Sequence, residues 1–395
     1  MTFPTPSRET LLEKKQIILD RIRSHHLRRW AGSEGNIFFI SDQYPGVWLE
    51  HTYDAILWAD YCPEDRRISR EQVKLFLSYQ KPSGQLPCYI WANEIGYGWT
   101  QECVAFTALC LEACEQNADD PDFLRECYEA CCRWDKWLCD TRMTMGKGLI
   151  EMFCGYDTGH DNSGRLWDLN YPGEFNKDGS IAPTDDPVLP ILAPDMNAVF
   201  YGDRVALSKM AGKLGLTEEA AAWREKAESV RQKLFEHCYD PEDQFFYDVD
   251  KNGNKRKIRS CSITNVFTEG VLDYDLGNEI FERYLHNEKE FWTPYPFPAV
   301  SVSDPLWIQK LPGNSWGFYS QGLTALRSMR WMEKYGRTAE MEEIMRRWVA
   351  AWCASETTQF GQELHPITGE PSKCSQWYSS CMLYFLYAIK RLYGI

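Results

Sequence analysis

DRVALSKMAGKLGLTEEAAAWREKAESVRQKL, residues 203–234, is the stretch that most directly predicts the fold. Apolar residues recur every three or four positions in its second half, which places them on one face of an α-helix. They are Ala220, Trp223, Ala227, Val230 and Leu234. The first half ends at Gly215, a residue type that commonly stops a helix, and Thr217 can cap the next one. The stretch therefore predicts two antiparallel helices joined by a short turn.

Similar helical periodicity recurs along the chain in consecutive pairs of segments. The segments are 7–29, 52–62, 69–80, 100–116, 121–139, 264–275, 277–286, 318–335, 338–353 and 376–393. Together with the first pair they make about twelve helices. The clearest strand signal, Phe245 to Val249, is short and precedes the turn pair Asn252-Gly253. Six helical hairpins predict an all-α protein, an (α/α)6 barrel in which residues 1–395 form a single domain.

Composition excludes several classes of partner. The net charge is −14, whereas binding to nucleic acid or to an anionic membrane requires a basic face. No apolar run reaches the length of about 20 residues that a membrane span needs. Residues 1–29 lack the apolar segment of a signal peptide, so we expect a cytoplasmic protein. A homo-oligomer is compatible with the sequence.

Fifteen cysteines, an odd number in a chain with no export signal, indicate free thiols rather than disulfides. The pairs Cys110/Cys114 and Cys127/Cys131 lie one helical turn apart and are interpreted as small buried apolar residues. The CxxC spacing of a structural zinc site is absent, so no metal and no cofactor are expected.

Two long segments without periodicity, about 141–194 and 287–316, are rich in Gly, Pro, Asp and Trp. Loops of this length in a compact domain usually carry function. Residues 157–165 combine Asp157 and Asp161 with an amide, a hydroxyl and an arginine. These acids either perform chemistry or only accept hydrogen bonds from backbone amides in a turn.

Within this loop, Gly159-x-Asp161-Asn162-Ser163-x-Arg165 resembles the signature of the trehalase and mannosyl-oligosaccharide glucosidase clan. The clan includes bacterial mannosylglycerate and glucosylglycerate hydrolases of glycoside hydrolase family 63. Its members are inverting glycosidases on (α/α)6 barrels. The resemblance implies that Asp161 is the general acid.

Further segments resemble the family's loops in the same order along the chain. They are 38–40 with 44–49, 84–87, 98–101, 314–317, and 362–369 followed by Trp377, together with 194–198, which resembles a helix start of the family. The resemblance implies that Glu363 is the general base, with Glu356 and Glu370 as alternatives. It also implies a set of substrate-binding residues: Tyr44, Trp48, Glu50, His51, Gln101, Asp157, Asn162, Arg165, Asp195, Asn197, Trp316 and Trp377. Arg165 would bind sugar hydroxyls or hold Asp157, and both roles stay open.

The chain departs from the family pattern inside these loops. Glu50-His51 stands where the family usually has Trp-Asp, Gly164 replaces a proline, and Trp316 replaces the arginine of a Trp-Arg-Gly segment. Those positions line the family's sugar pocket, so the substrates of its known members do not carry over directly. The resemblance as a whole implies an inverting, exo-acting α-glycoside hydrolase for a short glucosyl- or mannosyl-containing glycoside.

Two other functions remain as alternatives. The first is a sugar epimerase of the N-acylglucosamine 2-epimerase type on the same barrel, which would use histidines as acid and base. His51, His160 and His365 lie in the candidate loops. The second is a non-catalytic sugar-binding protein.

Overall fold

The structure of the protein is a computed structural model. The residues that it describes are 3–41, 44–100, 103–160, 163, 165, 186–307, 316–354 and 360–395.

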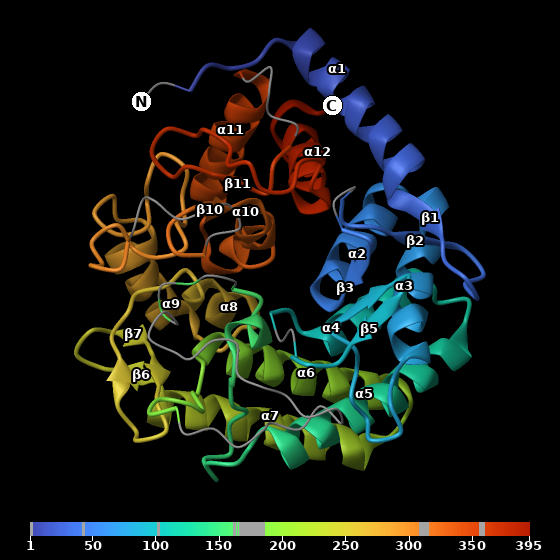
Figure 1. Ribbon diagram of the computed structural model, residues 1–395, viewed down its shortest axis with the longest axis vertical. Coiled ribbons are helices and arrows are strands. Elements are labelled where there is room, and N and C mark those ends of the chain that lie inside the picture. Colours follow the sequence, from blue (N-terminus) through green and yellow to red (C-terminus); the bar gives the residue numbers. More distant parts are fainter. Residues whose placement is uncertain are drawn as a thin grey trace.

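Twelve α-helices within these residues form two concentric rings (Figure 1). The inner ring consists of α2 (Thr52–Tyr61), α4 (Phe106–Gln116), α6 (Pro194–Lys213), α8 (Ile263–Thr268), α10 (Gly322–Ser328) and α12 (Ser379–Tyr393). Each inner helix contacts the next one along the chain, and α12 contacts α2, so the ring is closed. The outer ring consists of α1 (Arg8–Arg21), α3 (Arg67–Ser78), α5 (Pro121–Thr141), α7 (Thr217–His237), α9 (Tyr274–Ile280) and α11 (Thr338–Ala354). The fold is the (α/α)6 barrel that the sequence predicts.

The hairpin of α6 and α7 confirms the periodicity of residues 203–234. Trp223, Ala227, Val230 and Leu234 are buried, and Ala220 is partly buried against them. Gly215 has a φ of +76°, which suits glycine at a helix stop. The chain then turns at once, and α7 begins at Thr217 itself with Leu216 at its N-cap.

Three predicted helices are shorter than their apolar patterns. In the segment 7–29, α1 ends at Arg21 and a π-helical turn leads into a strand. In the segment 264–275, α8 ends at Thr268, and Asp273 then caps α9 by accepting a hydrogen bond from the Leu276 N–H. In the segment 318–335, α10 covers only seven residues. In the second and third segments much of the remainder is buried, and burial alone does not select helix over turn.

The strands are short and antiparallel. They pair as β1 (Leu27–Arg29) with β2 (Asn36–Phe38), β3 (Gly46–Trp48) with β4 (Tyr89–Trp91) and β5 (Glu94–Gly96), β6 (Tyr239–Asp240) with β7 (Phe245–Phe246), β8 (Asp248–Val249) with β9 (Lys255–Arg256), and β10 (Ser320–Gln321) with β11 (Glu363–Leu364). The predicted strand 245–249 is thus divided between two hairpins, the second of which turns at Asn252-Gly253.

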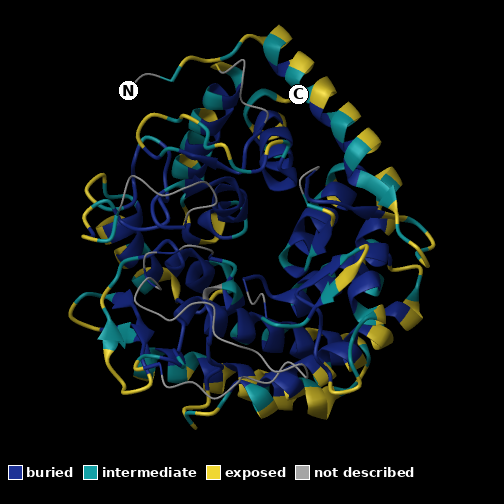
Figure 2. Cartoon of the chain, in the orientation of Figure 1, coloured by how far each residue is buried: buried dark blue, intermediate teal, exposed yellow. Residues whose placement is uncertain are grey.

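Burial follows the two rings (Figure 2). The inner helices are buried along most of their length, whereas the outer helices expose one face to solvent. Many of the tryptophans belong to the core. The side chains of five of them are fully buried: Trp58, Trp134, Trp331, Trp348 and Trp352. All fifteen cysteines are free thiols. Among the described helices, none is both long enough and apolar enough to cross a bilayer.

One opening of the barrel lies at the N-terminal ends of the inner helices, beside the three-stranded sheet β3–β4–β5. Gly46 allows β3 to lie close to β4, because a Cβ at this position would come 2.0 Å from the carbonyl oxygen of Ile90. Val47 is fully buried beneath the sheet, while Trp48 is directed toward the opening. The chain continues from Trp48 through a single 3-10 turn into α2.

Candidate functional site

A pocket of about 300 Å³ lies at this opening. The described residues that line it are Tyr44, Trp48, Glu50, His51, Tyr89, Trp91, Trp99, Tyr156, Gly159, Trp316, Leu323, Gln362 and Tyr378. They come from the loops and strands that precede the inner helices, and from the start of α10. The volume lies at the lower end of the range typical of small-molecule sites.

One wall of the pocket is a continuous layer of aromatic rings. The ring of Trp48 lies 4.8 Å from that of Tyr89 and 6.4 Å from the nearly parallel ring of Trp99. The ring of Trp99 in turn lies 4.7 Å from that of Tyr156. Flat amphipathic rings of this kind offer apolar faces and few polar groups. Such a wall is suited to the C–H faces of a sugar ring.

Glu50 supplies a carboxylate to the pocket. Arg327 of α10 donates a hydrogen bond of 2.6 Å to its Oε2, and the Cys103 thiol donates another of 3.3 Å. Burial acts to raise the pKa of Glu50, but the guanidinium of Arg327 and the neighbouring His51 outweigh it, so the pKa lies below its ordinary value. The pocket therefore contains an ionised hydrogen-bond acceptor.

His51 is held by the neighbouring inner helix, α12, which closes the ring. Its Nε2 lies 2.7 Å from the hydroxyl of Tyr378, which also lines the pocket. In the first turn of α2, the buried Asp54 accepts hydrogen bonds from Ser379 and Ser380 in the first turn of α12. These contacts join the first and last inner helices beside the pocket. Burial lowers the pKa of His51, which favours the neutral ring.

Asp157 lies behind the pocket wall and is not among the described lining residues. Its carboxylate accepts hydrogen bonds from the backbone N–H groups of Thr100, Phe153 and Cys154. Arg142 also donates to it at 3.0 Å, and both charged side chains are fully buried. Asp157 therefore organises the loop around it, and Arg142 rather than Arg165 holds it.

Arg165 forms a buried charge cluster with two carboxylates. It donates to Asp195 Oδ2 at 2.6 Å, to Asp248 Oδ1 at 3.3 Å and to the Ser262 hydroxyl at 3.0 Å. Burial and the neighbouring charge of Asp195 raise the pKa of Asp248 to about 6, although the positive charge of Arg165 opposes this rise. Asp195 stands in the first turn of α6, where the helix dipole also favours a negative charge. Arg165 thus links its loop to α6 and β8.

His160 connects this cluster to the pocket. Its ring stacks on that of Trp316 at 4.2 Å, and its Nδ1 lies 3.5 Å from Asp195 Oδ2. Burial lowers the pKa of His160 well below its ordinary value, and the charges of Arg165 and Arg327 act in the same direction. The ring is therefore neutral and serves as a support for Trp316.

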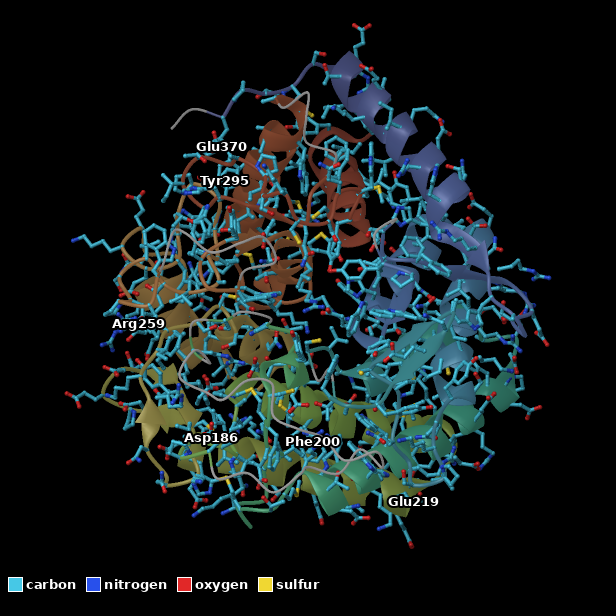
Figure 3. All side chains as sticks on the ribbon, in the orientation of Figure 1. Asp186, Phe200, Glu219, Arg259, Tyr295 and Glu370 are labelled. Atoms are coloured by element: carbon cyan, nitrogen blue, oxygen red, sulfur yellow. The ribbon has the colours of Figure 1, made fainter. Side chains whose placement is uncertain are left out.

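Glu363 is fully buried on β11, next to Gln362, which lines the pocket. The amide of Gln321 on β10 donates a hydrogen bond of 2.6 Å to Glu363 Oε2. Glu370, by contrast, lies on an exposed turn, where its backbone pairs with His365. Figure 3 shows Glu370 beside Tyr295 at the edge of the molecule.

The remaining residues implied by the resemblance are placed as follows. Asn197 uses its amide to bind both the N–H and the carbonyl of Ile150, so it connects α6 to the loop before the pocket. Trp377 lies under Arg21 of α1, at 5.0 Å, and is not among the described lining residues. Four further positions lie outside the described residues: Gln101, Asp161, Asn162 and Glu356. Of the implied set, the structure brings Tyr44, Trp48, Glu50, His51 and Trp316 together in the pocket.

Several lining residues are absent from the set that the resemblance implied. Tyr89 and Trp91 are two apart on β4, and this alternation could have indicated a shared face. Trp99, Gln362 and Tyr378 are each adjacent to, or within, a segment that the resemblance covers. Arg327 carries no local sign of its role, since it is 277 residues from Glu50.

Among the described residues, one group of three side chains has ligand atoms close enough to hold a metal ion: Glu282, His286 and Glu340. It lies on the outer ring and is not part of the pocket. Arg337 pairs with both carboxylates of the group, which places a positive charge there already.

A family model described as the mannosylglycerate hydrolase MGH1-like glycoside hydrolase domain matches residues 44–380. The chain belongs to this family. As a member of the MGH1-like family it is a glycoside hydrolase, which decides against the epimerase and the non-catalytic binding protein. An uncharacterized protein of Borreliella burgdorferi is 28% identical over 125 residues, which are 31% of this chain and 25% of that relative. The match thus spans about a quarter of the relative's length.

Solved structures agree with the fold. A mannosylglycerate hydrolase from Thermus thermophilus in complex with Tris is 16% identical, with a TM-score of 0.75 over 95% of this chain and 99% of that one. An uncharacterized conserved protein from the same organism is 16% identical, with a TM-score of 0.76 over 95% and 100% of the two chains. Neutral trehalase from Saccharomyces cerevisiae is 12% identical, with a TM-score of 0.69 over 90% and 74%. At these identities the likeness concerns the barrel alone.

Proposed function

We propose that this MGH1-like enzyme is an inverting, exo-acting hydrolase of short α-glycosides that carry a glucosyl or mannosyl residue. The observation that carries the proposal is the small pocket at the barrel mouth, with its aromatic wall and its ionised Glu50. A pocket of about 300 Å³ suits one sugar and a small leaving group better than a polymer. The structural likeness to a mannosylglycerate hydrolase makes glucosyl- and mannosyl-glycerates sensible first candidates.

Asp161 is the proposed general acid. It lies outside the described residues, but the described chain on both sides is anchored near the pocket. On one side, Gly159 and Tyr156 line the pocket and His160 stacks on Trp316. On the other side, Arg165 is tied to Asp195 and Asp248. The resemblance of residues 159–165 to the family signature carries the assignment of Asp161, and these contacts of the described flanking residues support it.

Glu363 is the proposed general base. It is buried next to a pocket residue, and the N–H that Gln321 donates to it suits a carboxylate that accepts hydrogen bonds. Glu370 is exposed on its turn, which makes it a weaker candidate than Glu363; the other alternative, Glu356, lies outside the described residues. In an inverting reaction the acid protonates the leaving oxygen while the base activates water on the opposite face of the ring. The two carboxyl groups should then stand roughly 6.5–9.5 Å apart.

The test is a panel of α-linked disaccharides and glucosyl- or mannosyl-glycerates, with the products followed by proton NMR. The first anomer released should have the inverted configuration. Asp161→Asn and Glu363→Gln should each lose about 10²–10⁴ in kcat while still binding substrate. Glu370→Gln is the matched control and should keep wild-type turnover.

Glycosyl fluorides separate the two roles, because their leaving group needs little protonation. The Asp161 variant should recover activity on them, and the Glu363 variant should not. A retained anomeric configuration, or full turnover in Glu363→Gln, would overturn the mechanism proposed here.

A further inference from the structure

A second cavity, of about 250 Å³, lies on the other side of the Glu50–Arg327 ion pair. It is lined by residues of α4, α6 and α8, by residues 103–105 before α4, and by residues at the end of α10 and after it. The two cavities have no described lining residue in common. They meet at one contact, since Arg327 and Cys103 line the second cavity and both donate to Glu50, which lines the first.

The side chains that line the second cavity include positive charges that have no ion-pair partner among the described residues. Arg330 pairs with Glu112, and Glu115 pairs with Lys213. Lys209 of α6 and Lys334, which follows α10, also line the cavity. Within the described chain, neither lysine has a carboxylate within ion-pair distance. Both lysines are exposed residues, so they stand where the cavity opens to solvent.

Arg327 adds a donor at the inner end of the cavity. The residue is about nine-tenths buried, and its Nη2 is engaged with Glu50. Its Nε, however, is buried without a hydrogen-bond partner in the part of the chain that the structure describes. A buried N–H without a partner is costly and is seldom left so in a folded protein. A ligand in the cavity would supply the missing acceptor.

We propose that this cavity binds a small oxyanion, a carboxylate or a phosphate. The Arg327 Nε donates to it from the inner end, and the ammonium groups of Lys209 and Lys334 bind it at the entrance. Charged donors of this kind form the stronger class of hydrogen bonds to carboxylates and phosphates. The site is separate from the sugar pocket and does not depend on the proposed hydrolysis.

Glu269 is the one acidic side chain of the cavity with no ion pair among the described residues. Its Oε2 packs against α6 at Gly202, where a Cβ would come within 2.1 Å of it. Burial raises the pKa of Glu269 to about 7, although Arg330 and Lys334 oppose this. Much of the population is therefore protonated near neutral pH, and in that form Glu269 does not repel an anion and can donate a hydrogen bond.

Isothermal titration calorimetry of the full chain tests the proposal, with inorganic phosphate and with acetate at constant ionic strength. One equivalent of one of these anions should bind saturably, and the two arms show whether phosphate or carboxylate is preferred. Lys334→Ala and Lys209→Ala should each weaken binding by roughly tenfold, the scale of one charge-assisted hydrogen bond. Lys289→Ala removes the same charge from an exposed loop outside the cavity and should bind as wild type does.

Because Lys209 and Lys334 are exposed, both variants are expected to fold, and their melting curves check this. Absence of saturable binding of either anion would overturn the proposal. So would binding that is unchanged in both lysine variants, because the anion would then occupy another site. Neither result depends on turnover, so a failure here is distinct from a failure of the proposed hydrolysis.

Discussion

Replacing Arg165 with alanine is expected to destabilise the protein, whatever it does to catalysis. Arg165 is about 2% exposed, and its guanidinium is the only described cation that contacts Asp195 and Asp248 through hydrogen bonds. Its removal leaves two buried carboxylates without their partner. Breaking a buried ion pair in this way typically costs about 3–5 kcal/mol.

The corresponding shift in melting temperature follows from the size of the chain. At about 2.1 cal/mol/K per residue, 395 residues have an unfolding entropy of about 0.8 kcal/mol/K near the midpoint. A loss of about 3–5 kcal/mol therefore lowers Tm by about 4–6 °C. Arg346→Ala, which removes an exposed guanidinium paired with Glu342, is the matched control and should change Tm by much less.

The Tm deficit of the Arg165→Ala variant should grow as pH rises. Burial and Asp195 already raise the pKa of Asp248 to about 6 against the opposing charge of Arg165, so the pKa rises further when Arg165 is removed. A carboxyl group with a raised folded-state pKa loses stability as pH rises from its unfolded value, about 4, through the folded one. The Tm deficit of Arg165→Ala should therefore be larger at pH 8 than at pH 5.

Differential scanning calorimetry at the two pH values checks both statements. An unchanged Tm with lost activity would show that Arg165 contacts the sugar, as one reading of the sequence suggested. An equal deficit at pH 5 and pH 8 would contradict the electrostatic explanation.

Two further predictions concern the two cavities. Trp48→Ala should raise KM by roughly fivefold, since one aromatic contact is worth about 1 kcal/mol, whereas the exposed Tyr274→Ala should not; an unchanged KM would show that Trp48 does not contact the sugar. Glu269→Gln should raise Tm relative to wild type at pH 8 but not at pH 5. The pKa of about 7 in the folded state exceeds the unfolded value of about 4.3, so wild type loses stability as pH rises between the two. A Tm difference that does not vary with pH would contradict this.

The sequence predicted the outer helices better than the inner ones, and packing explains why. An outer helix such as α7 buries one face and exposes the other, so its pattern has a clear period. Helix α6 is buried on nearly every side, because it packs against neighbours in its own ring and in the outer ring. Its first nine residues, from Pro194, therefore lack a clear period, and only the family resemblance of residues 194–198 indicates a helix start there.

The site was predicted less completely because polar residues in loops have two uses that look alike in a sequence. Asp157 and Asn197 satisfy backbone groups of neighbouring loops, whereas Glu50 and Gln362 line the pocket. No feature of the neighbouring sequence distinguishes the two groups of residues. Only the folded chain shows which carboxylates find backbone partners behind the wall and which reach the pocket.

The departure at Glu50-His51 is where the structure adds most to the family resemblance. Arg327 of α10 binds Glu50, and Tyr378, which directly precedes α12, contacts His51. Restoring the family's Trp-Asp pair would therefore remove the carboxylate that Arg327 binds and leave a buried guanidinium unpaired, at a cost of the same order as the Arg165 change. Because the pair faces the pocket, we expect it to distinguish this enzyme's sugar from that of its relatives. The two positions are coupled to their partners, so specificity should be exchanged between family members only when all four residues are exchanged together.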